Sequence, residues 1–149
     1  MDTAQQLFAL VELLLSERPF QREKVAAATQ TVPEVADRRS NRYFIVWEAD
    51  DSGLELLAGV EVRVPTRDND ARDGLVLLTI AEEAGAEVTQ ADVMRKYGSD
   101  PEVHPADPKA PPSAPVFLAY PCDWGTLRFG FSRTTPERLV KVVLDAVGS

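Results

Sequence analysis

The chain has 149 residues, of which 44% are hydrophobic and 27% are charged, and this length and composition fit one globular domain, expected over residues 1–149. Its net charge of −8 argues against a nucleic-acid partner, because phosphate binding needs clustered lysine and arginine side chains. The same charge favours a basic protein partner. The single cysteine, Cys122, excludes an internal disulfide bond, so nothing in the sequence points to an oxidising compartment.

Two helices are expected at the start of the chain. Apolar residues at the spacing of one helix face predict a helix that ends before Pro19; they are Leu7, Leu10, Val11, Leu14 and Leu15. Residues 21–29 are the candidate for a second, shorter helix. The apolar run at residues 7–15 is too short to cross a bilayer, which needs about 20 residues, and it lacks the basic flank and the cleavage site of a signal peptide.

The pattern then changes to that of β-strands. Residues 43–47 are aromatic and β-branched, which predicts a strand. Residues 60–64 alternate valine with charged side chains and predict a strand with one buried face. Residues 75–80 are almost entirely apolar and predict a third strand, which follows a polar loop at residues 65–74.

A further helix and a proline-rich segment follow. Thr89 is a suitable N-cap residue, and Asp92 stands three positions later, which is a variant of the capping box. The apolar side of this helix would be formed by Val93, Met94 and Tyr97. Residues 104–115 contain five prolines, so we expect a stiff extended connector there rather than a helix or a central strand.

Three more strands are predicted at the end of the chain. Residues 116–120 are apolar, whereas residues 127–131 and 140–144 alternate between apolar and other side chains. Their short joints favour consecutive antiparallel pairs, with the apolar side of residues 127–131 facing the helices. The predicted fold class is therefore α+β: an antiparallel sheet of about six strands in two βββ meanders, with helices packed on one face, in the order α-(α)-βββ-α-βββ.

An internal repeat supports a division into two halves. Residues 20–25 and 33–35 are echoed by residues 88–93 and 101–103, at one constant offset of 68 positions. In each copy a short polar helix candidate leads through a proline-containing loop into a run of strands. Such a duplication favours one broad sheet, and a broad sheet face is suited to binding. The expected pseudo-repeats are residues 1–82 and 83–149.

The residues that catalysis or metal binding would need are scarce. His104 is the only histidine, so a Ser-His-Asp or Cys-His site would require the proline-rich segment to fold over a nucleophile. Zinc would normally need several cysteine and histidine ligands. Residues 68–74 resemble a calcium loop but lack its glycine and glutamate at the required positions. We therefore expect no enzyme activity, no metal and no cofactor.

The hairpin around Trp124 is the predicted contact surface. Tryptophan, tyrosine and arginine carry much of the energy of protein interfaces, and Tyr120, Trp124 and Arg128 lie within nine residues. Asp123 in the same hairpin, together with Glu61, would supply the acidic complement to a basic target. The alternative interpretation of Trp124 is a plug over the edge of the core. The predicted partner-binding residues are Tyr120, Asp123, Trp124, Arg128 and Glu61.

A short motif precedes the last predicted meander. It consists of Thr89-x-x-Asp92-Val93, then Tyr97-Gly98, then Pro101, and residues 20–64 echo it loosely. In this pattern residues 88–145 resemble the repeat unit of the β-lactamase inhibitor protein and of small outer-membrane assembly lipoproteins of the SmpA/OmlA type. The chain differs in having no lipid-attachment cysteine near its start and no pair of cysteines. The resemblance implies a non-enzymatic domain that presents a sheet face or its loops to another protein.

The sequence leaves three functions open. The first is a bacterial inhibitor or immunity-type protein that neutralises a partner protein, such as a basic toxin. The second is a secretion chaperone that binds an effector protein, although such chaperones are expected to finish on a helix and this chain finishes on a predicted strand. The third is a small hydrolase, for which the sequence contains no catalytic motif. The chain as given indicates the cytoplasm, and the periplasm is the alternative if a signal peptide has been removed.

Overall fold

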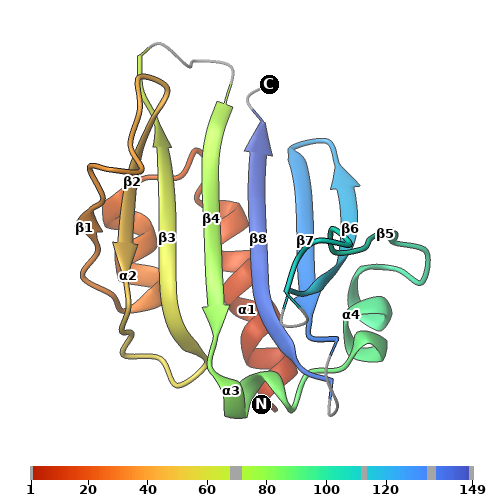
Figure 1. Ribbon diagram of the computed structural model, residues 1–149. Coiled ribbons are helices and arrows are strands. Elements are labelled where there is room, and N and C mark those ends of the chain that lie inside the picture. Colours follow the sequence, from red (N-terminus) through yellow and green to blue (C-terminus); the bar gives the residue numbers. More distant parts are fainter. Residues whose placement is uncertain (1, 68–71, 112–113, 134–136, 148–149) are drawn as a thin grey trace.

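The computed structural model describes residues 2–67, 72–111, 114–133 and 137–147. The described chain contains one sheet of eight antiparallel strands, in the order β1-β2-β3-β4-β8-β7-β6-β5, and α1 and α2 pack on one of its two faces (Figure 1). The α+β class predicted from the sequence is therefore confirmed. Part of the expected loop that resembles a calcium site lies outside the described residues.

The described sheet has more strands than the sequence predicted. The strands are β1 (Glu34–Val35), β2 (Phe44–Ala49), β3 (Leu57–Pro65), β4 (Arg72–Ile80), β5 (Glu102–His104), β6 (Val116–Cys122), β7 (Gly125–Phe131) and β8 (Leu139–Val147). The expectation of about six strands was wrong because β1 and β5 are too short to show an alternating pattern. Each directly follows a proline, Pro33 or Pro101, which suggested a loop. His104 accordingly belongs to β5 and not to the connector.

Helices begin and end close to the predicted positions. They are α1 (Thr3–Ser16), α2 (Arg22–Thr29), α3 (Glu82–Gly85) and α4 (Gln90–Tyr97). The apolar stripe of α1 is buried at Leu7, Leu10, Val11 and Leu14. The one-turn helix α3 was not predicted, because a single turn is too short to show helical periodicity.

The N-terminus of α4 has the predicted capping box. The Thr89 hydroxyl accepts from the Asp92 N–H at 3.1 Å, and the Asp92 carboxylate accepts from the Thr89 N–H at 3.0 Å. The bond from the Thr89 backbone is the main reason that the pKa of Asp92 lies below its ordinary value. This reciprocal pair satisfies two N–H groups at the start of α4 that have no partner within the helix.

Replacing Asp92 with alanine should lower the free energy of unfolding by about 1 kcal/mol at neutral pH. Because the pKa of Asp92 is lowered on folding, its contribution is present above the unfolded pKa and is lost as the pH falls through the folded pKa. The difference between wild type and variant should therefore shrink below about pH 4. Urea unfolding across this range measures it, and a difference that grows on acidification would contradict the capping role.

The core lies between the helices and the sheet. Phe129 of β7 is fully buried, and its ring centroid lies 6.3 Å from that of Phe8 on α1 and 5.2 Å from that of Tyr97 on α4. Leu127 and Phe131 are also buried. These contacts confirm that the apolar side of β7 faces the helices.

The two halves of the sheet contain the same order of elements. The offset of 68 positions, which separates Pro33 from Pro101, takes α2 onto α4 and β1 onto the start of β5. Each of these helices is followed by four strands. The last strands of the two halves, β4 and β8, pair at the centre of the sheet, and the first strands, β1 and β5, form its two edges. The result is an approximate two-fold arrangement with one continuous face on each side.

Candidate functional site

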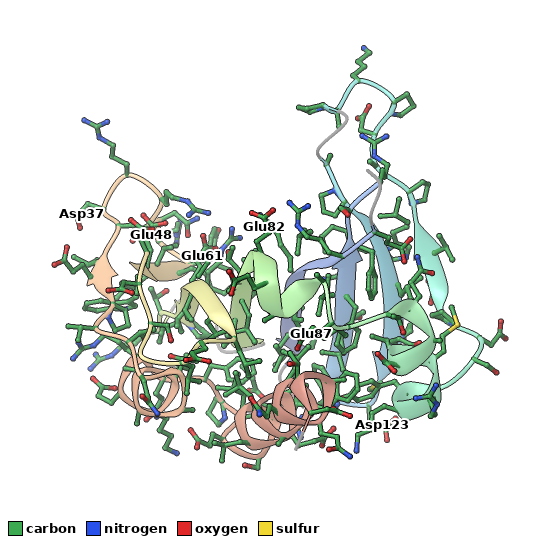
Figure 2. The ribbon with its side chains drawn as sticks, turned by 90° about the horizontal axis from the view of Figure 1, so that it is seen from below. Asp37, Glu48, Glu61, Glu82, Glu87 and Asp123 are labelled. Atoms are coloured by element: carbon green, nitrogen blue, oxygen red, sulfur yellow. The ribbon has the colours of Figure 1, made fainter. Side chains whose placement is uncertain are left out.

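One face of the sheet is left uncovered by helices. Figure 2 shows α1 and α2 packed beneath the sheet and no helix above it within the described chain. Two other segments rise above this free face at its sides. One is the Arg39 loop, which we define as residues 36–43 and which carries Asp37; the other is residues 105–111 of the proline-rich connector. The free face therefore lies between two raised segments.

The strand register places one residue of every strand in a single row across this free face. We call the surface formed by this row and by its neighbours on the same side the open face. Charged side chains predominate toward the two ends of the row, whereas leucine and valine occupy its two central strands. From β1 to β5 the row reads Glu34, Glu48, Glu61, Leu77, Val143, Arg128, Ala119 and Glu102.

The centre of the open face is apolar. Leu75 and Leu77 of β4 are half-buried, and Val143 of β8, which pairs with Leu77, is 8% exposed. Val76 and Leu78 of β4 are buried under the helices, so β4 carries apolar side chains on both of its faces. Fully burying a leucine side chain contributes about 1.5–3 kcal/mol, so this strip can stabilise a complex with an apolar surface.

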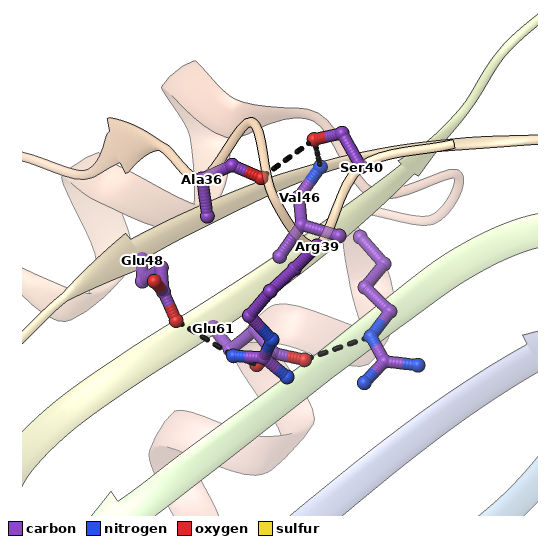
Figure 3. A network of polar contacts seen from close by, with 7 residues as sticks. Ala36, Arg39, Ser40, Val46, Glu48 and Glu61 are labelled. Atoms are coloured by element: carbon purple, nitrogen blue, oxygen red, sulfur yellow. Dashed lines mark hydrogen bonds and ion pairs between the residues drawn. The ribbon is translucent and has the colours of Figure 1, made fainter. Parts of the chain in front are cut away.

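An ion-pair network borders the apolar strip on the side of β2 and β3 (Figure 3). The Glu61 side chain is 8% exposed; it pairs with Arg39 through Oε1 and with Arg63 through Oε2, the latter at 2.8 Å. Arg39 also donates to Glu48 Oε2 at 2.6 Å. The bond to Glu48, followed by the charge of Glu61, raises the pKa of Arg39 above its ordinary value. Both oxygens of the buried carboxylate are thus paired, as burial of a charge requires.

The Arg39 loop is held in place by its own hydrogen bonds. Ser40 Oγ donates to the Ala36 carbonyl at 2.9 Å and accepts from the Val46 N–H at 3.0 Å (Figure 3). Asn41 Oδ1 accepts from two backbone N–H groups around the start of β2, at 2.8 and 3.0 Å. These bonds hold Arg39 over β2 and β3 without the help of a partner, so little entropy would be lost there on binding.

The opposite border of the open face is formed by β7 and the proline-rich connector. Arg128 on β7 approaches the carboxylate of Asp145 on β8 at 3.5 Å. The connector is attached through Arg133, which donates to the backbone carbonyls of Pro111 and Ala114, the latter at 2.8 Å. Both sides of the open face are therefore held by contacts within the chain.

Two hollows lie where the open face meets the turn between β2 and β3. The smaller, of about 170 Å³, opens beside Leu77 on the open face. The larger, of about 400 Å³, lies beside Glu34 and the segment that follows α2. Both are lined by Glu48 and Asp50, so carboxylates border both hollows.

Tyr120 does not lie on the open face. It is 9% exposed and packs against Tyr97 and Phe129 on the helix side of the sheet. Its hydroxyl donates to the Gly98 carbonyl at 2.8 Å, and burial raises the pKa of Tyr120 above its ordinary value. The prediction placed Tyr120 beside Arg128 because they are close in sequence, but alternation along the hairpin sends them to opposite faces.

The other predicted contact residues fall into two separate places. Glu61 and Arg128 lie in the same row of the open face, on either side of the apolar strip. Asp123 is exposed at the tip of the β6–β7 hairpin, and the neighbouring Trp124 is half-buried against the core. The guanidinium of Arg18 lies 5.3 Å from the centroid of the indole ring. This arrangement favours the interpretation of Trp124 as a plug over the core edge.

Replacing Trp124 with alanine should lower the free energy of unfolding by about 1–2 kcal/mol, less than for a fully buried aromatic side chain. The indole is half-buried against the core, and the guanidinium of Arg18 lies over its ring. Melting curves of wild type and variant measure the effect. An unchanged melting temperature together with weaker binding of a partner protein would instead make Trp124 an interface anchor.

His104 and Cys122, the histidine and the thiol of the chain, lie apart on β5 and β6. His104 pairs with Phe117 in β6, and Cys122 is the last residue of that strand, so about 16 Å of strand separates them. Partial burial and, next, the neighbouring Asp123 raise the pKa of the Cys122 thiol above its ordinary value. A raised pKa lowers the population of the reactive thiolate.

The apolar strip and Arg39 were missed by sequence reasoning. The signal for the strip was present, because β4 is apolar at successive positions, as expected of a strand that contacts something on both faces. Val143 is likewise apolar at a position where the alternation along β8 predicts a polar side chain. No comparable signal marks Arg39, since its place over β3 depends on the path of a loop.

Comparison of this chain with protein-family models, curated proteins and solved structures finds no match. Across the residues that the structure describes, no helix is long and apolar enough to cross a membrane. No group of three or more histidine, cysteine, aspartate or glutamate residues is placed to hold a metal ion in that part of the chain.

Proposed function

We propose that this chain is a non-enzymatic domain that binds another protein through the open face and neutralises it, as a bacterial inhibitor or immunity-type protein does. The observation that carries the proposal is the apolar strip of Leu75, Leu77 and Val143 at the centre of a sheet face that no described helix covers. Charged side chains border the strip on both sides. An apolar centre with a polar rim is the usual composition of a protein interface.

Rigidity supports an inhibitor rather than an adaptable binding module. The side chains of the open face stand on paired strands, and the Arg39 loop is fixed by hydrogen bonds to its own backbone and to β2. A surface that is already in its binding geometry loses little conformational entropy when the complex forms. Tight binding without catalysis is the requirement for neutralising a partner.

Site-directed photo-cross-linking in the producing organism tests this function. A photoreactive residue at Thr79 or at Thr126, both on the open face, should give a covalent adduct with the same protein. The matched control is Leu13, which is 46% exposed on α1 and should give no such adduct. The purified chain should then abolish the activity of that protein at equimolar concentration. Equal adducts from Leu13, or no loss of the partner's activity, would contradict the proposal.

A further inference from the structure

One end of the open face is rich in carboxylates. This end is formed by the β2–β3 turn, the end of β4 and α3. Between Arg42 and Arg63 the sequence contains no lysine or arginine, and neither does it between Arg72 and Arg95. The acidic residues in these two stretches are Glu48, Asp50, Asp51, Glu55, Glu61, Asp73, Glu82, Glu83, Glu87 and Asp92. Of these, Asp73 lies at the opposite end of β4 and Glu87 bonds to Thr3 of α1. Glu48, Asp50, Glu61 and Glu82 remain at this end of the open face.

Several of these carboxylates have no partner within the described chain. Glu61 and Glu48 are neutralised by the arginine network, whereas the side chains of Asp50 and Glu82 take part in no hydrogen bond or ion pair among the described residues. Figure 2 shows Glu82 on the side of the sheet that bears Glu48 and Glu61, and Asp50 lines the hollow beside Leu77. Unpaired charges beside an apolar docking surface are available to a partner.

The opposite half of the open face has a different character. Arg128 stands on β7 and is already paired with Asp145, whereas Lys141 of β8 pairs with Thr79 near the end of β4. The excess of carboxylates over basic side chains is therefore greatest near the β2–β3 turn. Such a gradient favours one orientation of a charged partner over the reverse, because opposing like charges costs several kcal/mol.

We infer that the partner presents a cationic protein surface to this acidic end, with an apolar patch over Leu77 and Val143. This inference rests on the proposed function and specifies its partner. Lysine or arginine side chains of the partner enter the two hollows that share Glu48 and Asp50. The unpaired carboxylates act at long range and mainly accelerate association, whereas the apolar strip holds the complex once it has formed.

Selection from a random peptide library displayed on phage tests the inference with a defined probe. Peptides selected on the purified wild-type chain should be enriched in arginine and lysine relative to the unselected library. Their affinity should fall by about tenfold when Asp50 and Glu82 are both replaced by lysine. The control substitution is Asp100→Lys, which adds a positive charge at an exposed position before β5 and should leave the affinity unchanged.

The outcomes separate the inference from the proposed function. Selected peptides that lose binding on Leu77→Asp but show no enrichment in basic residues would overturn the cationic partner and leave the docking face intact. Peptides whose binding is unaffected by Leu77→Asp would show that the open face is not the docking surface, which contradicts both. A loss of binding free energy from Asp100→Lys that is half or more of the loss from Asp50→Lys/Glu82→Lys, in proportion to the charge added, would reduce the effect to net charge and overturn the inference. Melting curves of every variant show whether it is folded.

Discussion

Replacing Phe129 with alanine should lower the free energy of unfolding by about 3–5 kcal/mol, the usual loss for a fully buried aromatic side chain. The ring is completely shielded from solvent and contacts Phe8, Tyr97 and Tyr120. It therefore joins α1 and α4 to two adjacent strands, and its removal leaves a cavity that none of these elements can fill without moving. Urea unfolding of wild type and variant measures the loss.

Phe117→Ala is the matched control for this prediction. Phe117 stands on the neighbouring strand, but it points to the other face of the sheet, packs over Gly130 and is only half-buried. Its loss should cost about 1 kcal/mol, as for an ordinary partly exposed side chain. Equal losses at the two positions would show that the core does not lie on the helix side of the sheet.

The second large effect is expected on binding. Replacing Leu77 with aspartate puts an unpaired carboxylate at the centre of the apolar strip, between Glu61 and Val143 in the row across the sheet. A partner docked there would have to desolvate that charge, so affinity for the cross-linked partner should fall roughly a hundredfold. Isothermal calorimetry measures the affinity, and a melting curve shows whether the variant is folded.

Leu13→Asp is the control for the binding measurement. Leu13 is the same residue type and is exposed on α1, on the far side of the sheet. The substitution makes the same chemical change away from the open face, so affinity should not change. A folded Leu77→Asp variant that binds as tightly as wild type would refute the docking role of the strip.

Sequence patterns predicted most of the local structure. The stripe on α1, the capping box at Thr89 and the apolar side of β7 each depend on neighbours in the sequence, and each is present. In β3, Val60 and Val62 are buried as expected, but Glu61 between them is buried as well. The edge strands β1 and β5 were not predicted, because two or three residues show no period. The central pairing of β4 with β8 was not predicted either, since it joins segments that are far apart in the chain.

The candidate site was predicted less well than the fold. Glu61 and Arg128 were chosen for their residue types and lie in one row of the open face, but their role in binding stays a prediction. Tyr120 was misplaced because proximity in sequence was read as proximity on a surface. The Arg39 network could not be predicted from the sequence, because it depends on a loop that folds back over two strands.

Methyl NMR of the isotope-labelled chain, titrated with the cross-linked partner, tests the central claim most directly. The methyl signals of Leu75, Leu77 and Val143 should shift or broaden as the complex forms, because these side chains occupy the centre of the open face. The signals of Leu13, on the opposite side of the sheet, should stay where they are. Shifts confined to Leu13 and its neighbours, with the three central methyl groups unaffected, would contradict the claim that the open face binds the partner.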